Sequence, residues 1–510
     1  MPPPTGGCSN IVSSWRRPLP GSSGGFFRSS SFLLAGSIAA QAIPLAALPL
    51  VSRLYTPEAI GLQTLAVSWA TVISVVITFR LDLAAVLPQS QDAAKRIVHA
   101  ALTAMLVTVP VFAIVLAVFW RGVLDVIGSS EAGFWILFVI VLSVAMALSQ
   151  IATAVLIRER KFARMATMNV ANQGITQSLA LALGVAGAWV GGPVLARTVG
   201  QLSAVGVVLS GGLAGYIRSW RPSIANLRSV AAEYRQFPTF NVPYSVISTT
   251  ARDAPLIIFG IFASAATVGI YGLARVIMFV PTSLASVSFS PVFFRAAVDE
   301  IGTPVLERRA RHLLRLGLFV PAAAFALVAV RGPEIFVTAF GEPWQQAGLF
   351  AAVLAPASWF TIQSSWIGRV FEVSGRQRRQ LVMQIATDTV VILSVLVTLM
   401  LSGDFLTAVW AFAITTSVQA VVYFFMAASA AGFAIRPFCL DWFAGAIWWL
   451  AALAAVLGIE LLSFSSVVTL WISVGFVAAA TAVSLAVFGR GLKLRGPGTP
   501  EISGGEGRDE

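Results

Sequence analysis

Three charged residues lie inside a stretch that is otherwise apolar enough to cross a membrane: Arg252, Asp253 and Arg275. The sequence predicts one helix over Phe237–Phe262 and the next over Ser264–Phe294. At a rise of about 1.5 Å per residue, all three charges then lie roughly 17 Å below one surface. That depth is near the middle of a hydrocarbon layer about 30 Å thick. Because charges are costly there, they predict a functional or ion-paired site.

Polar residues accompany these charges on both helices. Before Arg252 they recur at spacings of three and four residues, which places them on one helix face. The second helix carries a sparser stripe around Arg275. The first stripe contains Asn241, Tyr244, Ser245, Ser248 and Thr249, and the second contains Tyr271, Thr282 and Ser286. Two polar faces that meet at buried charges predict a water-filled cavity rather than a lipid-facing surface.

The composition excludes a water-soluble fold. Hydrophobic residues make up 57% of the 510, charged residues 11%, and the mean hydropathy is +0.85, which predicts an all-α integral membrane protein. The net charge of +12 does not indicate a nucleic-acid-binding protein, because the basic residues are spread between apolar segments. Two cysteines and two histidines offer too few ligands for zinc or haem. We therefore expect no cofactor.

Fourteen apolar segments are long enough to span a membrane as helices. The first six are Ser31–Ser52, Ala59–Phe79, Ile97–Phe119, Gly133–Ile157, Met165–Trp189 and Gly192–Tyr216. The next six are Phe237–Phe262, Ser264–Phe294, His312–Val330, Gln345–Ile367, Leu381–Leu401 and Phe405–Ala427. Two further spans, Trp442–Leu462 and Ser466–Phe488, follow these.

These spans predict two six-helix lobes and an additional helix pair. The predicted parts are a disordered tail (1–30), an N-lobe (31–216), a basic linker (217–236), a C-lobe (237–427), helices 13 and 14 (442–488) and a second tail (489–510). With the first residue placed inside, 27 of the 34 basic residues lie in inner segments, 3 in outer loops and 4 within spans. This asymmetry predicts that both termini are cytoplasmic.

An internal repeat supports the two-lobe arrangement. TPEAIGLQTLA at Thr56–Ala66 aligns without gaps to SAATVGIYGLA at Ser264–Ala274, at an offset of 208 residues. The two segments share a glycine at Gly61 and Gly269. Because the offset corresponds to six helices, both lobes have the same orientation, and their symmetry axis should run along the membrane normal.

The first helical hairpin also resembles a known family. The segment RLYTPEAIGLQTLAVSWATVISVVITFRLDLAAVLP, from Arg53 to Pro88, resembles the polysaccharide-biosynthesis (Wzx-type) flippases of the multidrug/oligosaccharidyl-lipid/polysaccharide exporter superfamily. The resembling positions include Arg80 and Asp82. The stretch from Phe237 to Arg295 and the segment FEVSGRQRRQ are similar to other parts of that family, and helices 13 and 14 resemble the extra pair of lipid II flippases.

The resemblance implies export of a lipid-diphosphate-linked oligosaccharide by alternating access, in exopolysaccharide, O-antigen or capsule synthesis. Arginine suits a diphosphate, because its guanidinium stays ionised and presents a planar fork to phosphate oxygens. We therefore predict that Arg252 and Arg275 bind the diphosphate. The polar residues predicted to line the site with them are Asn241, Tyr244, Ser248, Thr249 and Tyr271. The alternative is that Asp253 and Arg275 form a structural ion pair.

Two other helices carry candidate residues. Asn172 and Gln173 belong to a polar stripe on helix 5, which either lines the cavity for sugar hydroxyls or forms hydrogen bonds between helices. Asp388 on helix 11 is a candidate for ion coupling, as is Asp253, although a polar contact between helices explains Asp388 equally well. No Walker sequence occurs, so ATP is not expected to drive transport directly.

Other functions remain open at this point. A cation-coupled drug or metabolite antiporter of the same superfamily is the main alternative, and its cavity should present carboxylates where this chain presents arginines. A membrane glycosyltransferase or polymerase would need catalytic acids on a large outer loop, and a scaffold would not need aligned polar stripes. The predicted location is the bacterial inner membrane. The predicted partners are a lipid-linked oligosaccharide, the bilayer and polysaccharide polymerase machinery.

Overall fold

The computed structural model describes residues 23–88, 90–118, 132–159, 161–187, 189–209, 213–462 and 466–488. Within these ranges the regular structure is helical, with no strand. Most of the two predicted tails, residues 1–22 and 489–510, lies outside the described residues, as does Arg121, which was predicted in an outer loop. The first described helix begins at Ser23, eight residues before the predicted start of helix 1.

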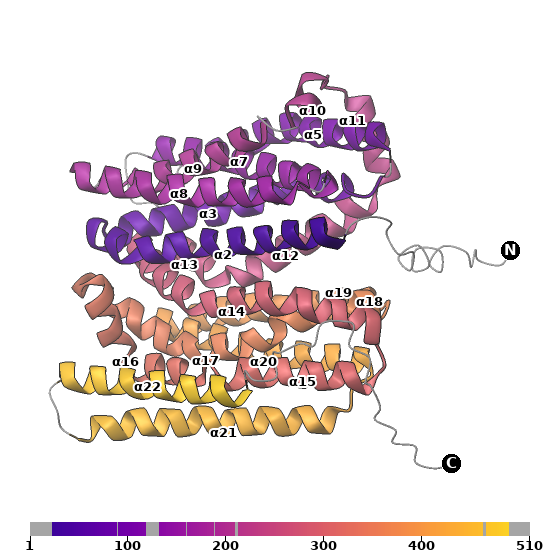
Figure 1. The fold of residues 1–510 in the computed structure, drawn as a ribbon. Coiled ribbons are helices and arrows are strands. Elements are labelled where there is room, and N and C mark those ends of the chain that lie inside the picture. The colour runs from indigo at the N-terminus through magenta and orange to yellow at the C-terminus, as the bar shows by residue number, and fades with distance from the viewer. Residues whose placement is uncertain are drawn as a thin grey trace, which may run out of the picture.

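The first half of the chain forms one bundle of helices, coloured indigo to magenta in Figure 1. It consists of α2 (Ser23–Leu54), α3 (Pro57–Ile77), α4 (Leu81–Ala84), α5 (Gln91–Val118), α7 (Ala132–Arg158), α8 (Phe162–Gly187), α9 (Gly192–Val208), α10 (Ala214–Arg218) and α11 (Ile224–Glu233). A π-helical turn, η2 (Phe237–Asn241), leads into the second half.

The second half lies beside the first and is coloured from rose to yellow (Figure 1). It consists of α12 (Val242–Arg252), α13 (Ala254–Phe262), α14 (Ala265–Glu300), α15 (Pro304–Phe319), α16 (Ala322–Phe340), η3 (Glu342–Trp344), α17 (Gln345–Ile367), α18 (Val370–Val373), α19 (Gln377–Ser402) and α20 (Phe405–Ala431). The final pair is α21 (Ile435–Glu460) and α22 (Ser466–Phe488).

The predicted all-α membrane architecture is confirmed. Ten helical spans among the described residues are long and apolar enough to cross a membrane, and the bent pair α12–α13 makes an eleventh. Helices α2, α8 and α9 correspond to the remaining three predicted spans. Helix α8 carries the polar stripe around Asn172, α9 has 17 residues, and within α2 the apolar segment is Ala39–Leu54. The predicted total of about fourteen therefore agrees with the structure.

The ninth predicted span differs most from the structure. His312–Val330 was predicted, whereas α15 and α16 together cover Pro304 to Phe340. Arg331, which was predicted in an outer loop, is a buried residue of α16 at 4% exposure, and Pro333 follows it at a kink. Arg331 itself has non-helical dihedral angles (φ −111°, ψ 18°), so the predicted end at Val330 coincides with the kink, and a further helical segment follows it.

The two lobes touch through the two copies of the sequence repeat. A Cβ atom on Gly61 of α3 would lie 1.7 Å from the carbonyl oxygen of Ala265 on α14. A Cβ atom on Gly269 of α14 would lie 1.9 Å from the carbonyl oxygen of Pro57 on α3. These reciprocal contacts place the aligned glycines against each other at the beginnings of both helices. Only glycine permits so close an approach of the two backbones.

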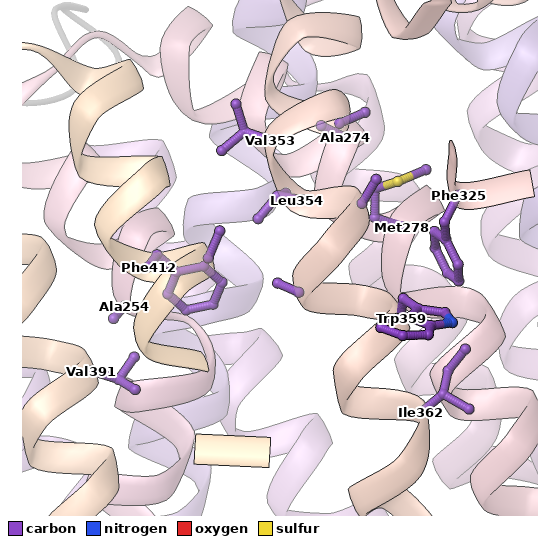
Figure 2. Close-up of a cluster of buried hydrophobic side chains, with 14 of the residues drawn as sticks. Ala254, Ala274, Met278, Phe325, Val353, Leu354, Trp359, Ile362, Val391 and Phe412 are labelled. Carbon is purple, nitrogen blue, oxygen red and sulfur yellow. The ribbon is translucent and has the colours of Figure 1, made fainter. Parts of the chain in front are cut away.

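A dense hydrophobic core fills the second lobe and extends across the lobe contact to Ala47 of α2 and Leu65 of α3. Figure 2 shows side chains of α14, α16, α17 and α20 in this cluster, including Met278, Phe325, Trp359 and Phe412. Trp359 is 2% exposed, and its indole nitrogen donates a hydrogen bond to the Leu318 carbonyl oxygen at 2.8 Å. The core therefore satisfies the polar atom of this large side chain while it buries the ring.

The helix pair at the end of the chain is attached to the second lobe by ion pairs at both ends of α21. Near its beginning, Asp441 is buried and accepts hydrogen bonds from Arg311 (2.7 and 3.1 Å) and Arg315 (2.9 Å) of α15. At its end, Glu460 pairs with Arg331 of α16 at 3.1 Å. These contacts attach α21 to both α15 and α16.

Candidate functional site

The predicted seventh span is broken at its charges. The segments Phe237–Arg252 and Ala254–Phe262 meet at an angle of 73°. Asp253 stands between them with non-helical dihedral angles (φ −105°, ψ 15°), and Pro255 follows in the first turn of α13. Proline lacks a backbone N–H and favours the first turn of a helix, which explains why a new helix starts here. The depth calculated for one straight helix therefore does not apply.

Arg275 of α14 closes this break. Its guanidinium forms an ion pair with Asp253 at 2.5 Å and donates a hydrogen bond to the carbonyl oxygen of Arg252 at 3.1 Å. The carbonyl belongs to the last turn of α12, where helix carbonyls have no intrahelical partner. The side chains of Arg275 and Asp253 are 20% and 12% exposed. The structure thus contains the Asp253–Arg275 ion pair, which is the structural alternative to a role of these residues in binding the diphosphate.

Arg252 differs from Arg275 in its surroundings. Its side chain is 64% exposed, and its closest ionic contact is a long one of 3.9 Å to Asp253. The carboxylate of Asp253 is engaged more closely by Arg275. Two arginines share one aspartate, so the cluster carries an excess positive charge, and Arg252 is the member with its guanidinium most accessible.

Tyr271 does not line an open cavity in this conformation. It is fully buried in α14, and its ring packs edge-on against Phe259 at 5.4 Å and Phe350 at 6.0 Å. Its hydroxyl group has no hydrogen-bond partner among the described residues. The helical spacing correctly placed Tyr271 one turn from Arg275, but the aromatic neighbours turn its ring into the core.

Asp388 of α19 forms a second polar centre. It is 4% exposed and accepts hydrogen bonds from Ser248 of α12 (2.8 Å), Gln384 of α19 (2.8 Å) and Gln419 of α20 (2.6 Å). All three donors are neutral. Gln419 also donates to Thr387 at 3.0 Å. Gln419 was not among the predicted site residues, although a glutamine within an apolar helix is the kind of signal that identifies such a partner.

The remaining residues of the α12 stripe do not share one environment. Ser248 faces α19, where it binds Asp388, and Thr249 is buried at 9% exposure. Asn241 and Tyr244 are half-buried near the beginning of the helix. Part of the predicted stripe therefore lies at the interface between α12 and α19, where the hydroxyl group of Ser248 donates to Asp388.

In the first lobe the polar candidates form a neutral network. Asn172 of α8 donates to the side-chain oxygen of Gln201 of α9 at 2.7 Å, and Gln201 donates to Ser149 of α7 at 2.8 Å. Three helices are thus linked by uncharged groups, which is the alternative considered for this stripe. Gln173 is half-buried beside Asn172. Neither residue lies in the charged cluster of α12 and α14.

The turn after α3 contains the other charged residues of the first hairpin. Phe79 and Arg80 both have positive φ, at 50° and 56°. Asp82 is buried, pairs with Arg80 at 3.6 Å and accepts a hydrogen bond from Thr78 at 3.0 Å. Burial raises the pKa of Asp82, while Arg80 and Thr78 oppose the rise. Two consecutive left-handed residues are costly outside glycine, so tertiary contacts must hold this turn.

Several solved structures are similar to this chain in their overall fold. A lipid II flippase MurJ in an inward closed conformation aligns with a TM-score of 0.67 and 13% identity, covering 90% of this chain and 99% of that one. An inward-facing multidrug resistance MATE family transporter of the MOP superfamily aligns with a TM-score of 0.53 and 14% identity, covering 83% and 98%. A mutant of the Vibrio cholerae MATE transporter VcmN aligns with a TM-score of 0.50 and 14% identity, covering 81% and 96%. This chain shares their fold.

The sequence itself identifies the family. No curated protein matches the chain. A family model described as "Polysaccharide biosynthesis protein" matches residues 50–349, which include the first hairpin, the broken helix and both copies of the repeat. This match covers more than half of the 510 residues. The protein with the charged break between α12 and α13 therefore belongs to the polysaccharide biosynthesis protein family.

Proposed function

We propose that this protein is a flippase that moves a polyprenyl-diphosphate-linked oligosaccharide from the inner to the outer leaflet of the bacterial inner membrane. The glycan would serve exopolysaccharide, O-antigen or capsule synthesis. Family membership and the fold support a transporter, and Arg252 carries the choice of substrate. An exposed guanidinium at a helix break offers a phosphate group the charge-assisted hydrogen bonds that it loses when it leaves water.

Arg252 and Arg275 have different roles in this proposal. Arg252 binds the diphosphate directly, because its side chain is exposed and only weakly paired with Asp253. Arg275 holds the break through Asp253 and the Arg252 carbonyl, and it adds positive potential beside the substrate. Asn241 and Tyr244 lie earlier on the same helix and contact the first sugar. Thr249, Tyr271, Asn172 and Gln173 become accessible only if the lobes rearrange.

Alternating access requires the lobe contact to open. The backbone approach of Gly61 and Gly269 closes the beginnings of α3 and α14, which are at the outer surface in the proposed topology. Two further contacts reinforce this end: the indole nitrogen of Trp344 donates to the Ser52 carbonyl at 2.9 Å, and Arg53 donates to the Thr338 carbonyl at 3.3 Å. We infer that this conformation is closed to the outside and receives substrate from the arginine-rich, cytoplasmic side.

Replacement of Arg252 tests the substrate assignment. The purified full chain is reconstituted in vesicles with a fluorescent lipid-diphosphate oligosaccharide, and translocation is measured by quenching from one side. R252A should lower the rate about 10- to 100-fold, because a hydrogen bond to a charged group contributes about 1.5–3 kcal/mol. R252K should keep part of the rate, and R308A, which removes an exposed arginine of α15, should keep all of it. Full activity of R252A overturns the proposal.

A cation-coupled antiporter is the second candidate, and Asp388 favours it. Its buried carboxylate accepts three neutral hydrogen bonds and has no cationic partner among the described residues. Such a carboxylate is available to a coupling ion or proton, whereas Asp253 is already neutralised by Arg275. In a flippase, Asp388 would bind the ion whose gradient drives translocation of the lipid. In an antiporter, it would bind the ion that is exchanged for a cationic drug.

D388N separates these roles. The amide keeps the shape of the side chain, and the Ser248 hydroxyl can accept a hydrogen bond from it, so unfolding free energy should change by less than about 1 kcal/mol. Translocation of the lipid-linked oligosaccharide should lose its dependence on an imposed sodium or proton gradient. If the gradient dependence persists in D388N, the coupling role is wrong. If vesicles exchange a cationic dye but no lipid-linked oligosaccharide, the antiporter is correct.

A further inference from the structure

A groove with a volume of about 540 Å³ lies at the arginine-rich end of the second lobe. It is formed where α19 begins and α20 approaches its end, on the right side of the second lobe in Figure 1. Its lining combines two kinds of residue, three arginines and three apolar side chains. They are Arg376, Arg378, Arg379, Val382, Met383 and Met426.

The arginines of this groove have little negative charge near them. Arg378 and Arg379 are exposed and form no ion pair with any residue that the structure describes. Arg376 donates to the Ser429 carbonyl oxygen at 3.3 Å, which is a neutral partner. Glu372, the nearest acidic residue in the sequence, is engaged by Arg369 at 2.7 Å. The three arginines therefore leave positive charge uncompensated beside a groove whose accessible surface is almost entirely apolar.

The start of α19 adds to this potential. Its N-cap position is occupied by Arg376, which provides no side-chain cap for the first backbone N–H groups. Uncapped N–H groups and the helix dipole both favour an anion at a helix N-terminus. The helix N-terminus and the three nearby arginines therefore both favour an anion at this end of α19. The anion-binding character thus comes from the side chains and from the backbone together.

The apolar side of the groove favours an amphiphilic ligand over a purely soluble one. Val382, one turn after Arg378, has 62% of its surface exposed. Met383 and Met426 complete this surface from α19 and α20. One helical turn separates the charged and apolar parts, a distance of about 5–6 Å. This matches the separation of a lipid phosphate from the beginning of its acyl chains.

We propose that this groove binds an anionic phospholipid of the surrounding bilayer. The phosphate contacts Arg376, Arg378 and Arg379, and an acyl chain lies along Val382 and Met426. A zwitterionic lipid would bring its own positive charge against three arginines, so the groove selects for net negative headgroups. Basic pockets between membrane helices commonly recognise such headgroups. The site is separate from Arg252 and does not depend on the proposed transport activity.

Photolabelling tests this site. The full chain is reconstituted in phosphatidylcholine vesicles that contain phosphatidylglycerol with a photoreactive group in its acyl chain, and labelled residues are mapped by mass spectrometry. Val382, Met383 and Met426 should be labelled. R378Q/R379Q should weaken apparent affinity about 30-fold, because each basic residue near a membrane surface contributes about 1 kcal/mol. R378K/R379K should keep most of the labelling, since the charge remains.

A matched variant and competitors decide the result. R308Q/R436Q removes the same charge from exposed arginines outside the groove and should label normally. If R378Q/R379Q does not fold, each single variant should show about a 5-fold loss. Equal labelling by a photoreactive phosphatidylcholine, or unchanged labelling of the R378Q and R379Q variants, overturns the proposal. So does displacement by inorganic phosphate, which indicates a soluble anion, or preferential displacement by a polyprenyl phosphate, which indicates the transported lipid.

Discussion

The two lobes share a repeat but differ in their charges. At the offset of 208 residues that aligns Gly61 with Gly269, Pro44, Leu45 and Val67 stand opposite Arg252, Asp253 and Arg275. The first helix continues through Pro44 from Ser23 to Leu54, whereas the seventh span bends by 73° at Asp253. The first lobe has a neutral Asn172–Gln201–Ser149 network, and the second has an ionic break. The two lobes therefore share a helix arrangement, and the charged cluster at the helix break belongs to the second lobe.

The largest expected effect is removal of the counter-ion at the break. D253A leaves Arg275 without its 2.5 Å partner in a largely buried position and should lower the free energy of unfolding by about 3 kcal/mol. Chemical unfolding in detergent measures the loss. D299A, whose pair with Arg295 is exposed on the same helix, should cost less than about 1 kcal/mol.

A double variant sharpens this result. If Asp253 acts mainly by neutralising Arg275, D253A/R275A should be more stable than D253A alone. Equal stability of D253A and D299A would instead show that the break needs no ion pair, and that the difference in charge between the lobes does not affect stability.

The next largest effect concerns the contact that the lobes share. G61A puts a methyl group against the Ala265 carbonyl, and G269A puts one against the Pro57 carbonyl, so each should lower unfolding free energy by about 1–3 kcal/mol. Because the contacts are reciprocal, the two losses should be similar. G458A is the control, since nothing lies within 4 Å of the added methyl group. A loss in only one of the two variants would contradict a symmetric interface.

The smallest effect is expected for the neutral network. N172A removes the 2.7 Å hydrogen bond to Gln201 and should cost about 1 kcal/mol, the usual net contribution of a neutral hydrogen bond. S178A, at an exposed position of the same helix, is the control. Thermal unfolding in detergent checks this value. A loss as large as that of D253A would remove the energetic distinction between the lobes.

The sequence was sufficient to predict most of the fold. Hydropathy located the spans, because a membrane helix must be apolar over about 20 residues. Its limits appear at α15, where Arg311 and Arg315 lower the local hydropathy although Asp441 neutralises them from α21. The repeat placed Gly61 and Gly269 in equivalent positions, but their mutual contact depends on how the lobes pack, which the sequence does not encode locally.

The site was predicted less completely. Helical spacing brought Arg252, Asp253 and Arg275 together correctly, but it assumed a straight helix. Proline alone could not predict the break, since Pro281 lies within the continuous α14 while Pro255 begins a new helix. The burial of Tyr271 depends on Phe350, a residue 79 positions away in the sequence. Such long-range contacts are set by tertiary packing and not by periodicity.

The attachment of α21 at both ends has a practical consequence for following the transport cycle. Asp441 attaches this helix to α15 and Glu460 attaches it to α16, and α22 packs beside it through Ala480. A fluorophore on α22 would turn with the second lobe as one rigid body. Paired with a second fluorophore on α8, it would report in real time how far the lobes rotate during each turnover, without any label near the substrate.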